Sequence, residues 1–195
     1  HEVNDHVRGV SDTLRRRGHT VTVLAPSSRA ADLLEGRRSL QRGELGDVVA
    51  IGPAVPTSLS DRVGLPVGVR ANLAAALALG RFDVVHGFEP GLPSLSYAAL
   101  LEAESTTAAT FFSPERLTYL PRKNQRAKLL ARVDALLATS DEMVAAASTR
   151  FPGDYTVVSP GVDTARFVPG TKRRLIAVEN APPHASVGRA LLRAL

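Results

Sequence analysis

The chain has 195 residues, 44% of them hydrophobic, which suits one globular domain of ordinary size or one domain with a fragment of another. It contains no cysteine, so disulfides and thiolate metal sites are excluded. The net charge of +5 is almost all arginine, since lysine occurs only at positions 123, 128 and 172; this excess can serve phosphate groups, an anionic lipid surface or nucleic acid, or can reflect genomic base bias on a solvated surface.

The first elements of the chain are a helix and then a strand. Apolar residues at three- and four-residue steps predict an amphipathic helix from Val3 to Leu14, which Gly18 ends. A short strand from Val21 to Leu24 follows and ends at Pro26. Doubly wound domains begin with a strand, so we expect that the first strand of this unit is missing.

Strands and helices then alternate along the chain. The patterns predict strands at 47–51, 84–87, 107–111, 135–139 and 155–158, helices at 69–79, 94–104, 123–132 and 141–150, and a Gly/Pro-rich loop from 52 to 68. Such alternation is typical of a parallel sheet covered by helices on both faces. We therefore expect an α/β fold with a doubly wound, Rossmann-like parallel sheet over residues 1–170. A further strand (174–178) and helix (186–195) cannot bury their own faces, so residues 171–195 are expected to open a second domain.

Five segments carry a resemblance to a known family. In chain order they are 17–26 (RGHTVTVLAP), 82–90 (FDVVHGFEP), 109–113 (ATFFS), 133–140 (VDALLATS) and 159–169 (SPGVDTARFVP). The ordered set resembles the N-terminal domain of GT-B-fold family 4 glycosyltransferases, of the phosphatidylinositol mannosyltransferase-like kind. The resemblance implies that residues 1–170 are the acceptor-side half of a GT-B fold and that residues 171–195 begin the donor-binding domain.

The function that this resemblance implies is retaining transfer of a hexose from a nucleotide-sugar donor to a lipid, glycan or small-molecule acceptor. It implies no metal and no cofactor, and an isolated chain that is inactive because most of the donor pocket lies in the other domain. The basic helix at 122–132 is a candidate contact for anionic lipid head groups, or is simply solvated. No apolar run reaches the length of a membrane span, and the N-terminus lacks a signal-peptide layout, so we expect a cytoplasmic, at most membrane-peripheral protein. Nucleic-acid binding is not expected, because no motif supports it.

Candidate site residues follow the ends of two predicted strands. Ligands of parallel α/β sheets bind beyond the carboxyl ends of the strands, which is where Glu89, Phe112 and Ser113 fall. Glu89 either lines the cleft or supplies a negative charge to the helix after Pro93. By the resemblance, Asn4 falls where a polar residue often contacts an acceptor phosphate. The acceptor-site candidates are therefore Asn4, Glu89, Phe112 and Ser113.

Phe112 is the sharpest departure from the family pattern, because many relatives carry a His there beside the reacting sugar. Phenylalanine exchanges no proton, so no catalytic residue is assigned. Phe112 either stacks on a sugar face in an acceptor pocket or points into the core. Phe88 likewise replaces the second His of the family's His-x-His-Glu-Pro turn. By the resemblance, His6 matches a common His of the family's first helix. Because it also lies on the Val3 face of that helix, we expect a core histidine with its hydrogen bonds satisfied.

The alternative is a glycosyltransferase-like module that binds a ligand or partner without transferring sugar. Three features favour it: Phe112, a carboxylate at Glu2 where relatives have glycine near the donor diphosphate, and the segment 179–186, which carries no cation.

Overall fold

A computed structural model describes residues 2–56, 62–64, 69–91, 94–118 and 121–171. The chain divides into two compact units, His1–Gly161 and Val162–Leu195. The strand expected at 174–178 and the helix expected at 186–195 lie outside the described residues. The domain boundary near residue 170 stays a prediction.

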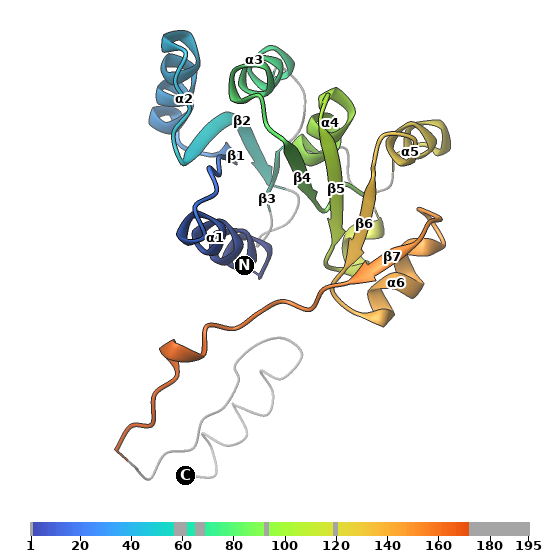
Figure 1. Cartoon of the computed structure of the whole chain (residues 1–195). Helices are drawn as coiled ribbons and strands as arrows, with labels where there is room; N and C mark the ends of the chain where they lie inside the picture. The colour runs from blue at the N-terminus through green and yellow to red at the C-terminus, as the bar shows by residue number, and fades with distance from the viewer. Residues whose placement is uncertain (1, 57–61, 65–68, 92–93, 119–120, 172–195) are drawn as a thin grey trace, which may run out of the picture. The chain divides into compact units, whose positions relative to one another are not determined.

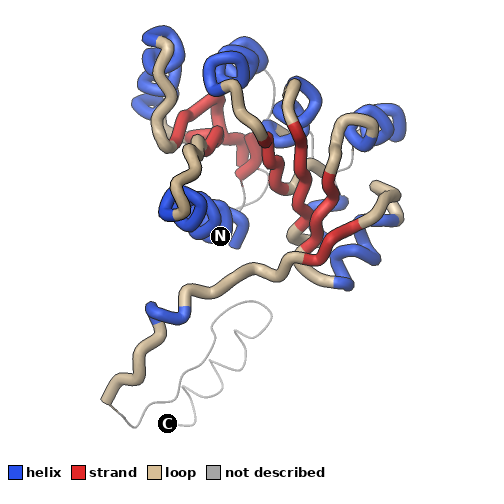
Figure 2. Tube along the Cα trace, viewed as in Figure 1, coloured by secondary structure: helices blue, strands red, loops and turns tan. Residues whose placement is uncertain are grey.

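The first unit is a Rossmann-like α/β domain, as expected. Its elements are α1 (Glu2–Arg16), β1 (Val23–Ser27), α2 (Ala30–Arg42), β2 (Val48–Pro56), β3 (Arg62–Gly64), α3 (Arg70–Gly80), β4 (Val84–Phe88), α4 (Leu95–Glu102), β5 (Thr106–Phe111), a 3-10 turn (Pro114–Thr118), α5 (Lys123–Leu130), β6 (Ala135–Ala138), α6 (Asp141–Ser148) and β7 (Tyr155–Val157). The strands form two sheets, in the orders β1-β2-β3 and β4-β5-β6-β7 (Figure 2). Every pairing is parallel except β2 with β3.

The two sheets share one hydrophobic core although, among the described residues, no strand pairing joins them. Val49 and Ile51 of β2, Leu73 of α3 and Phe111 of β5 belong to the same buried cluster. The side chain of Leu73 is fully buried. Side-chain packing therefore connects the halves of the domain.

Helices α2, α3, α4 and α5 stand in a row along one side of the strands, and α1 lies on the other side (Figure 1). Gly36 allows α2 to approach β2, since a Cβ atom there would lie 2.3 Å from the carbonyl oxygen of Ala50. At the end of α1, the Arg15 guanidinium donates to the carbonyl oxygens of Val21 (2.8 Å) and Asp47 (2.9 Å). This side chain thereby ties α1 to the segments that enter β1 and β2.

The helix boundaries follow the local signals in the sequence. Gly18 takes the left-handed conformation (φ 90°) just beyond α1. Ser94 and Ser140 cap α4 and α6, each accepting a hydrogen bond from the backbone N–H three residues ahead. The elements expected between residues 69 and 158 are all confirmed, with ends shifted by one or two residues.

Two segments differ from the expectation. The sequence patterns assign no element to residues 28–46, where the structure has α2; the helix has a glycine at its centre and consecutive arginines next to it, so its apolar stripe is thin. The loop expected from 52 to 68 is wrong in part, because β2 continues to Pro56 and pairs with β3. Glycine and proline favour loops, and here they are tolerated in the second half of β2, where the pairing passes from β1 to the short β3.

Candidate functional site

The carboxyl ends of β4 and β5 are joined by Glu89. Its backbone N–H donates to Thr110 O at 2.9 Å, and its side-chain Oε1 accepts from Phe112 N at 2.9 Å. Helix α4 has its own cap in Ser94, so the Glu89 carboxylate serves the end of β5 instead of the first turn of that helix. The structure thus brings Glu89, Phe112 and Ser113 together at the edge of the sheet where ligands of this fold class bind.

Glu89 is held in an unfavourable environment. Only 5% of the residue is exposed, and Oε2 has no hydrogen-bond partner among the described residues. Burial raises the pKa of this carboxyl to about 7, against the opposing influence of the N–H of Phe112 and the charge of Arg116. The backbone is also in the left-handed region, with φ 53°. Glu89 therefore exchanges a proton near neutral pH from a position fixed on both strands.

Four aromatic rings gather beside Glu89, and we call them the ring cluster: His6 of α1, His86 and Phe88 of β4, and Phe112. The His86 and Phe88 rings stack at a centroid distance of 4.2 Å. His6 meets Phe112 edge to face at 4.9 Å and Phe88 at 5.9 Å. None of the four belongs to the main buried core cluster of the described residues. The ring cluster is thus a separate apolar contact that holds α1 against the ends of β4 and β5.

Phe112 fits neither of its two expected placements fully. Phe112 is buried, with 7% of its surface exposed. Its ring packs against His6 and Phe88, however, and not in the main core. Whether Phe112 contacts an acceptor stays a prediction.

The two histidines of the ring cluster differ in their hydrogen bonding. His86 Nε2 lies 2.7 Å from the Thr110 hydroxyl, whereas the half-buried ring of His6 makes no hydrogen bond with any described residue. Desolvation lowers the pKa of both, and the charge of His6 lowers that of His86 further. The expectation that His6 has its hydrogen bonds satisfied therefore stays a prediction.

Ser113 and Asn4 complete the set of expected site residues. The Ser113 hydroxyl donates to the carboxylate of Glu115. Asn4 is exposed and lies two residues before His6, about 200° around the helix, so its side chain leaves α1 on nearly the opposite face from the ring cluster. Three of the four candidates are thus together and Asn4 is apart. Glu2 begins α1, and its side chain is outside the described set.

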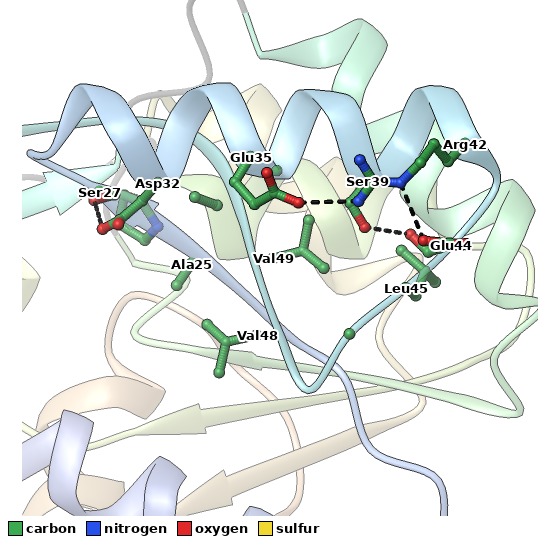
Figure 3. Close-up of a pocket in the computed structure, with 14 residues that line it drawn as sticks. Ala25, Ser27, Asp32, Glu35, Ser39, Arg42, Glu44, Leu45, Val48 and Val49 are labelled. Atoms are coloured by element: carbon green, nitrogen blue, oxygen red, sulfur yellow. Dashed lines mark hydrogen bonds and ion pairs between the residues drawn. The ribbon is translucent and has the colours of Figure 1, made fainter.

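A separate cavity of about 640 Å³ lies between α2 and the strands β1 and β2 (Figure 3). Its charged side chains are already partnered: Arg42 contacts Glu35 at 2.9 Å and Glu44 at 3.1 Å, and Asp32 accepts from the Ser27 hydroxyl. None of the site residues expected from the sequence lines it. The internal pairing leaves no polar group that calls for a ligand.

The described residues contain no group of three or more His, Cys, Asp or Glu side chains placed to hold a metal ion. Among the helices that the structure describes, none has the length and apolar composition to cross a membrane.

The sequence leads to Glu89, Phe112 and Ser113 but misses His6 as a member of this site. The available signal is that positions 88 and 112 are both aromatic at neighbouring strand ends, which predicts a ring-lined edge for the first helix to cover. Helical periodicity places His6 on an inward face, but it does not say which strand ends that face covers.

Comparison with known proteins places this domain in a family. The model of Glycosyltransferase Family 4 matches residues 3–166. The chain is 29% identical over 170 residues to a phosphatidyl-myo-inositol mannosyltransferase of Propionibacterium freudenreichii, covering 85% of this chain and 44% of that protein. It is 36% identical to the proteins of the same name from Mycobacterium leprae (112 residues) and Mycobacterium tuberculosis (115 residues), in each case covering 56% of this chain and 27% of the relative. The chain therefore spans less than half the length of these relatives, and it belongs to glycosyltransferase family 4.

Proposed function

We propose that this chain forms the acceptor-side domain of a retaining glycosyltransferase that moves a hexose from a nucleotide-sugar donor to a lipid, glycan or small-molecule acceptor. The names of the relatives favour a mannosyl group and a phosphatidyl-myo-inositol acceptor. We further propose that transfer requires neither a metal ion nor a cofactor, and that the chain alone does not turn over because the donor is held mainly by residues beyond this domain.

The observation that carries the proposal is the joining of the β4 and β5 ends by Glu89 within a domain that matches the family from residue 3 to 166. A protonatable carboxyl next to aromatic rings suits an acceptor that presents hydroxyls on one edge and C–H groups on its face. We assign Glu89, Phe112 and Ser113 to the acceptor-facing wall, and Asn4 to a separate contact in the first turn of α1.

A nucleotide-release assay tests the proposal. A full-length protein that carries this chain is expected to release GDP or UDP from a nucleotide-sugar when phosphatidylinositol is present, at a rate that EDTA leaves unchanged. The 195-residue chain alone is expected to give no release. A full-length protein that neither turns over nor binds nucleoside diphosphates would reject the enzyme proposal.

The second candidate is a non-catalytic binding module, and the burial of Phe112 under two other rings favours it. Calorimetry with GDP and UDP on the full-length protein separates the two candidates. Tight binding supports the transferase, whereas acceptor binding without nucleotide binding supports the module.

We also propose that α5 makes a peripheral contact with anionic lipid. The segment 122–132 carries five cations and no acidic residue. Arg122, Lys123 and Lys128 are exposed and form no ion pair with any described residue, although such pairs occur on α1, α2 and α3. Unpaired cations on one helix attract an anionic surface at about 1 kcal/mol each.

Vesicle sedimentation tests this contact. Replacing Lys123 and Lys128 with Gln is expected to weaken binding to phosphatidylglycerol-containing vesicles by about 30-fold, with no effect on phosphatidylcholine vesicles. The matched control replaces Arg37 and Arg38, two exposed cations of α2, and is expected to have a smaller effect. Equal losses from both pairs would reject a contact specific to α5.

A further inference from the structure

His6 is the member of the ring cluster whose ring nitrogens have no hydrogen-bond partner among the described residues. Its ring centroid lies 4.9 Å from that of Phe112 and 5.9 Å from that of Phe88, and both ring pairs are arranged edge to face. Its two nitrogens make no hydrogen bond with any described residue. The residue is half-buried, so part of its surface stays open. Within the described part of the chain, this imidazole has lost water on one side and has no hydrogen-bond partner that replaces it.

The other polar side chains of this edge are already engaged or enclosed. The Thr110 hydroxyl is 2.7 Å from His86 Nε2, and the Ser113 hydroxyl donates a hydrogen bond to the Glu115 carboxylate. Glu89 is buried, and its carboxylate is fixed to Phe112 N through Oε1. His6 is therefore more exposed to an incoming group than Glu89 is.

We propose that His6 is an acceptor-binding residue that hydrogen-bonds a hydroxyl of a cyclic polyol, such as an inositol or a sugar, while Phe88 contacts the C–H face of the same ring. This inference rests on the function proposed above, and it names a ligand contact that the sequence does not predict. The chemistry matches on both sides. A neutral imidazole can donate or accept one hydrogen bond to a hydroxyl, and the burial that lowers the pKa of His6 favours this neutral form. Cyclic polyols combine polar edges with apolar C–H faces, which suits a histidine set beside a phenylalanine.

The position of His6 on a helix gives this contact a defined geometry. The ring is carried by α1, whereas Phe88 and Phe112 are carried by the sheet. A polyol bound to both His6 and Phe88 would therefore bridge α1 and β4. Binding is expected to tighten the packing of α1, because the ligand would add contacts between α1 and β4, where the ring cluster already packs.

The test uses NMR on the 195-residue chain with myo-inositol and methyl α-mannoside as probes. At least one probe is expected to shift the His6 ring signals saturably and to move the pKa of His6, with the His19 signals unchanged. The substitution His6→Phe keeps a ring in the cluster but removes both nitrogens, and it is expected to weaken binding by about ten-fold at an unchanged melting temperature. His19→Phe replaces an exposed histidine outside the cluster and is the matched control, with binding expected as in the wild type.

Each outcome decides the inference separately from the proposed function. No saturable shift with either probe, or equal binding by His6→Phe, would overturn the role of His6. In the full-length protein the substitution is expected to raise KM for the acceptor more than it lowers kcat. Turnover with an unchanged KM would overturn the inference and leave the transferase standing. Polyol binding at His6 in a protein that never transfers sugar would uphold the inference and reject the transferase.

Discussion

Glu89 combines two costs in one residue: a left-handed backbone (φ 53°) and a buried carboxyl with one oxygen that has no hydrogen-bond partner in the part of the chain that the structure describes. Each feature typically costs on the order of 1–3 kcal/mol. Natural sequences retain such costs where a side chain does something that no easier residue does. Here the carboxyl links two strand ends and keeps a protonatable oxygen at the edge of the sheet.

The raised pKa of Glu89 predicts a pH dependence of stability. The unfolded carboxyl ionises near its ordinary value of 4.5, and the folded one near 7. The contribution of Glu89 is therefore fully present below pH 4.5 and is lost as the pH rises through 7, by on the order of 3 kcal/mol. Glu89→Gln keeps the acceptor for Phe112 N and removes the titration, so the variant is expected to gain stability relative to wild type between about pH 5 and pH 8.

Urea unfolding at several pH values measures this difference. Histidine titrations occur in both proteins and cancel in the comparison. Wild-type and Glu89→Gln curves that stay parallel over the whole range would show that Glu89 is ionised at all these pH values.

At the residue scale, the sequence predicts Glu89, Phe112 and Ser113 as site residues because each follows a strand, and the carboxyl ends of parallel strands meet at one edge of the sheet. It does not find the state of His6, which depends on how α1 sits across two strand ends far away in the sequence. Nor does it give the pKa of Glu89, because that depends on the enclosing side chains and not on neighbours along the chain.

At the scale of elements, the close approach of α2 to β2 predicts the effect of a single methyl group. Gly36→Ala would place a Cβ 2.3 Å from Ala50 O, a backbone atom that cannot turn aside, so α2 must move. We expect a loss of about 1–3 kcal/mol in the free energy of unfolding. The control is Gly9→Ala in α1, where nothing lies within 4 Å of the new Cβ; it is expected to stabilise by about 0.5–1 kcal/mol.

Chemical denaturation of the two variants measures both changes in the free energy of unfolding. A Gly36→Ala variant as stable as wild type would mean that α2 is not seated on β2 as described. The same glycine accounts for the failure to foresee α2, since a glycine that is required by packing reads as a helix breaker in the sequence.

At the scale of the whole domain, the shared core predicts that the two sheets unfold together. Leu73 is fully buried in α3 within the core that includes β2 and β5 residues. Leu73→Ala is expected to cost about 2–5 kcal/mol, with protection against hydrogen exchange falling equally in both sheets. Leu79→Ala, at a 37% exposed position of the same helix, is the control and is expected to change stability little.

Two separate unfolding transitions, or loss of protection in one sheet alone, would contradict a common core. The sequence predicts the alternation of strands and helices that builds this domain, because its apolar periods are local. It does not predict the division into two sheets, since strand partners are chosen by contacts far apart along the chain.

The hydrogen bond from Phe112 to Glu89 uses the backbone N–H of residue 112 and not its side chain. Any residue but proline supplies that N–H. The strand ends therefore stay joined whichever side chain occupies position 112. A histidine at position 112, whose ring can transfer protons, can accordingly be replaced by a phenylalanine without loss of the hydrogen bond to Glu89. Chemistry at position 112 is open to evolutionary replacement, whereas position 89 must keep a side-chain oxygen that accepts from that N–H.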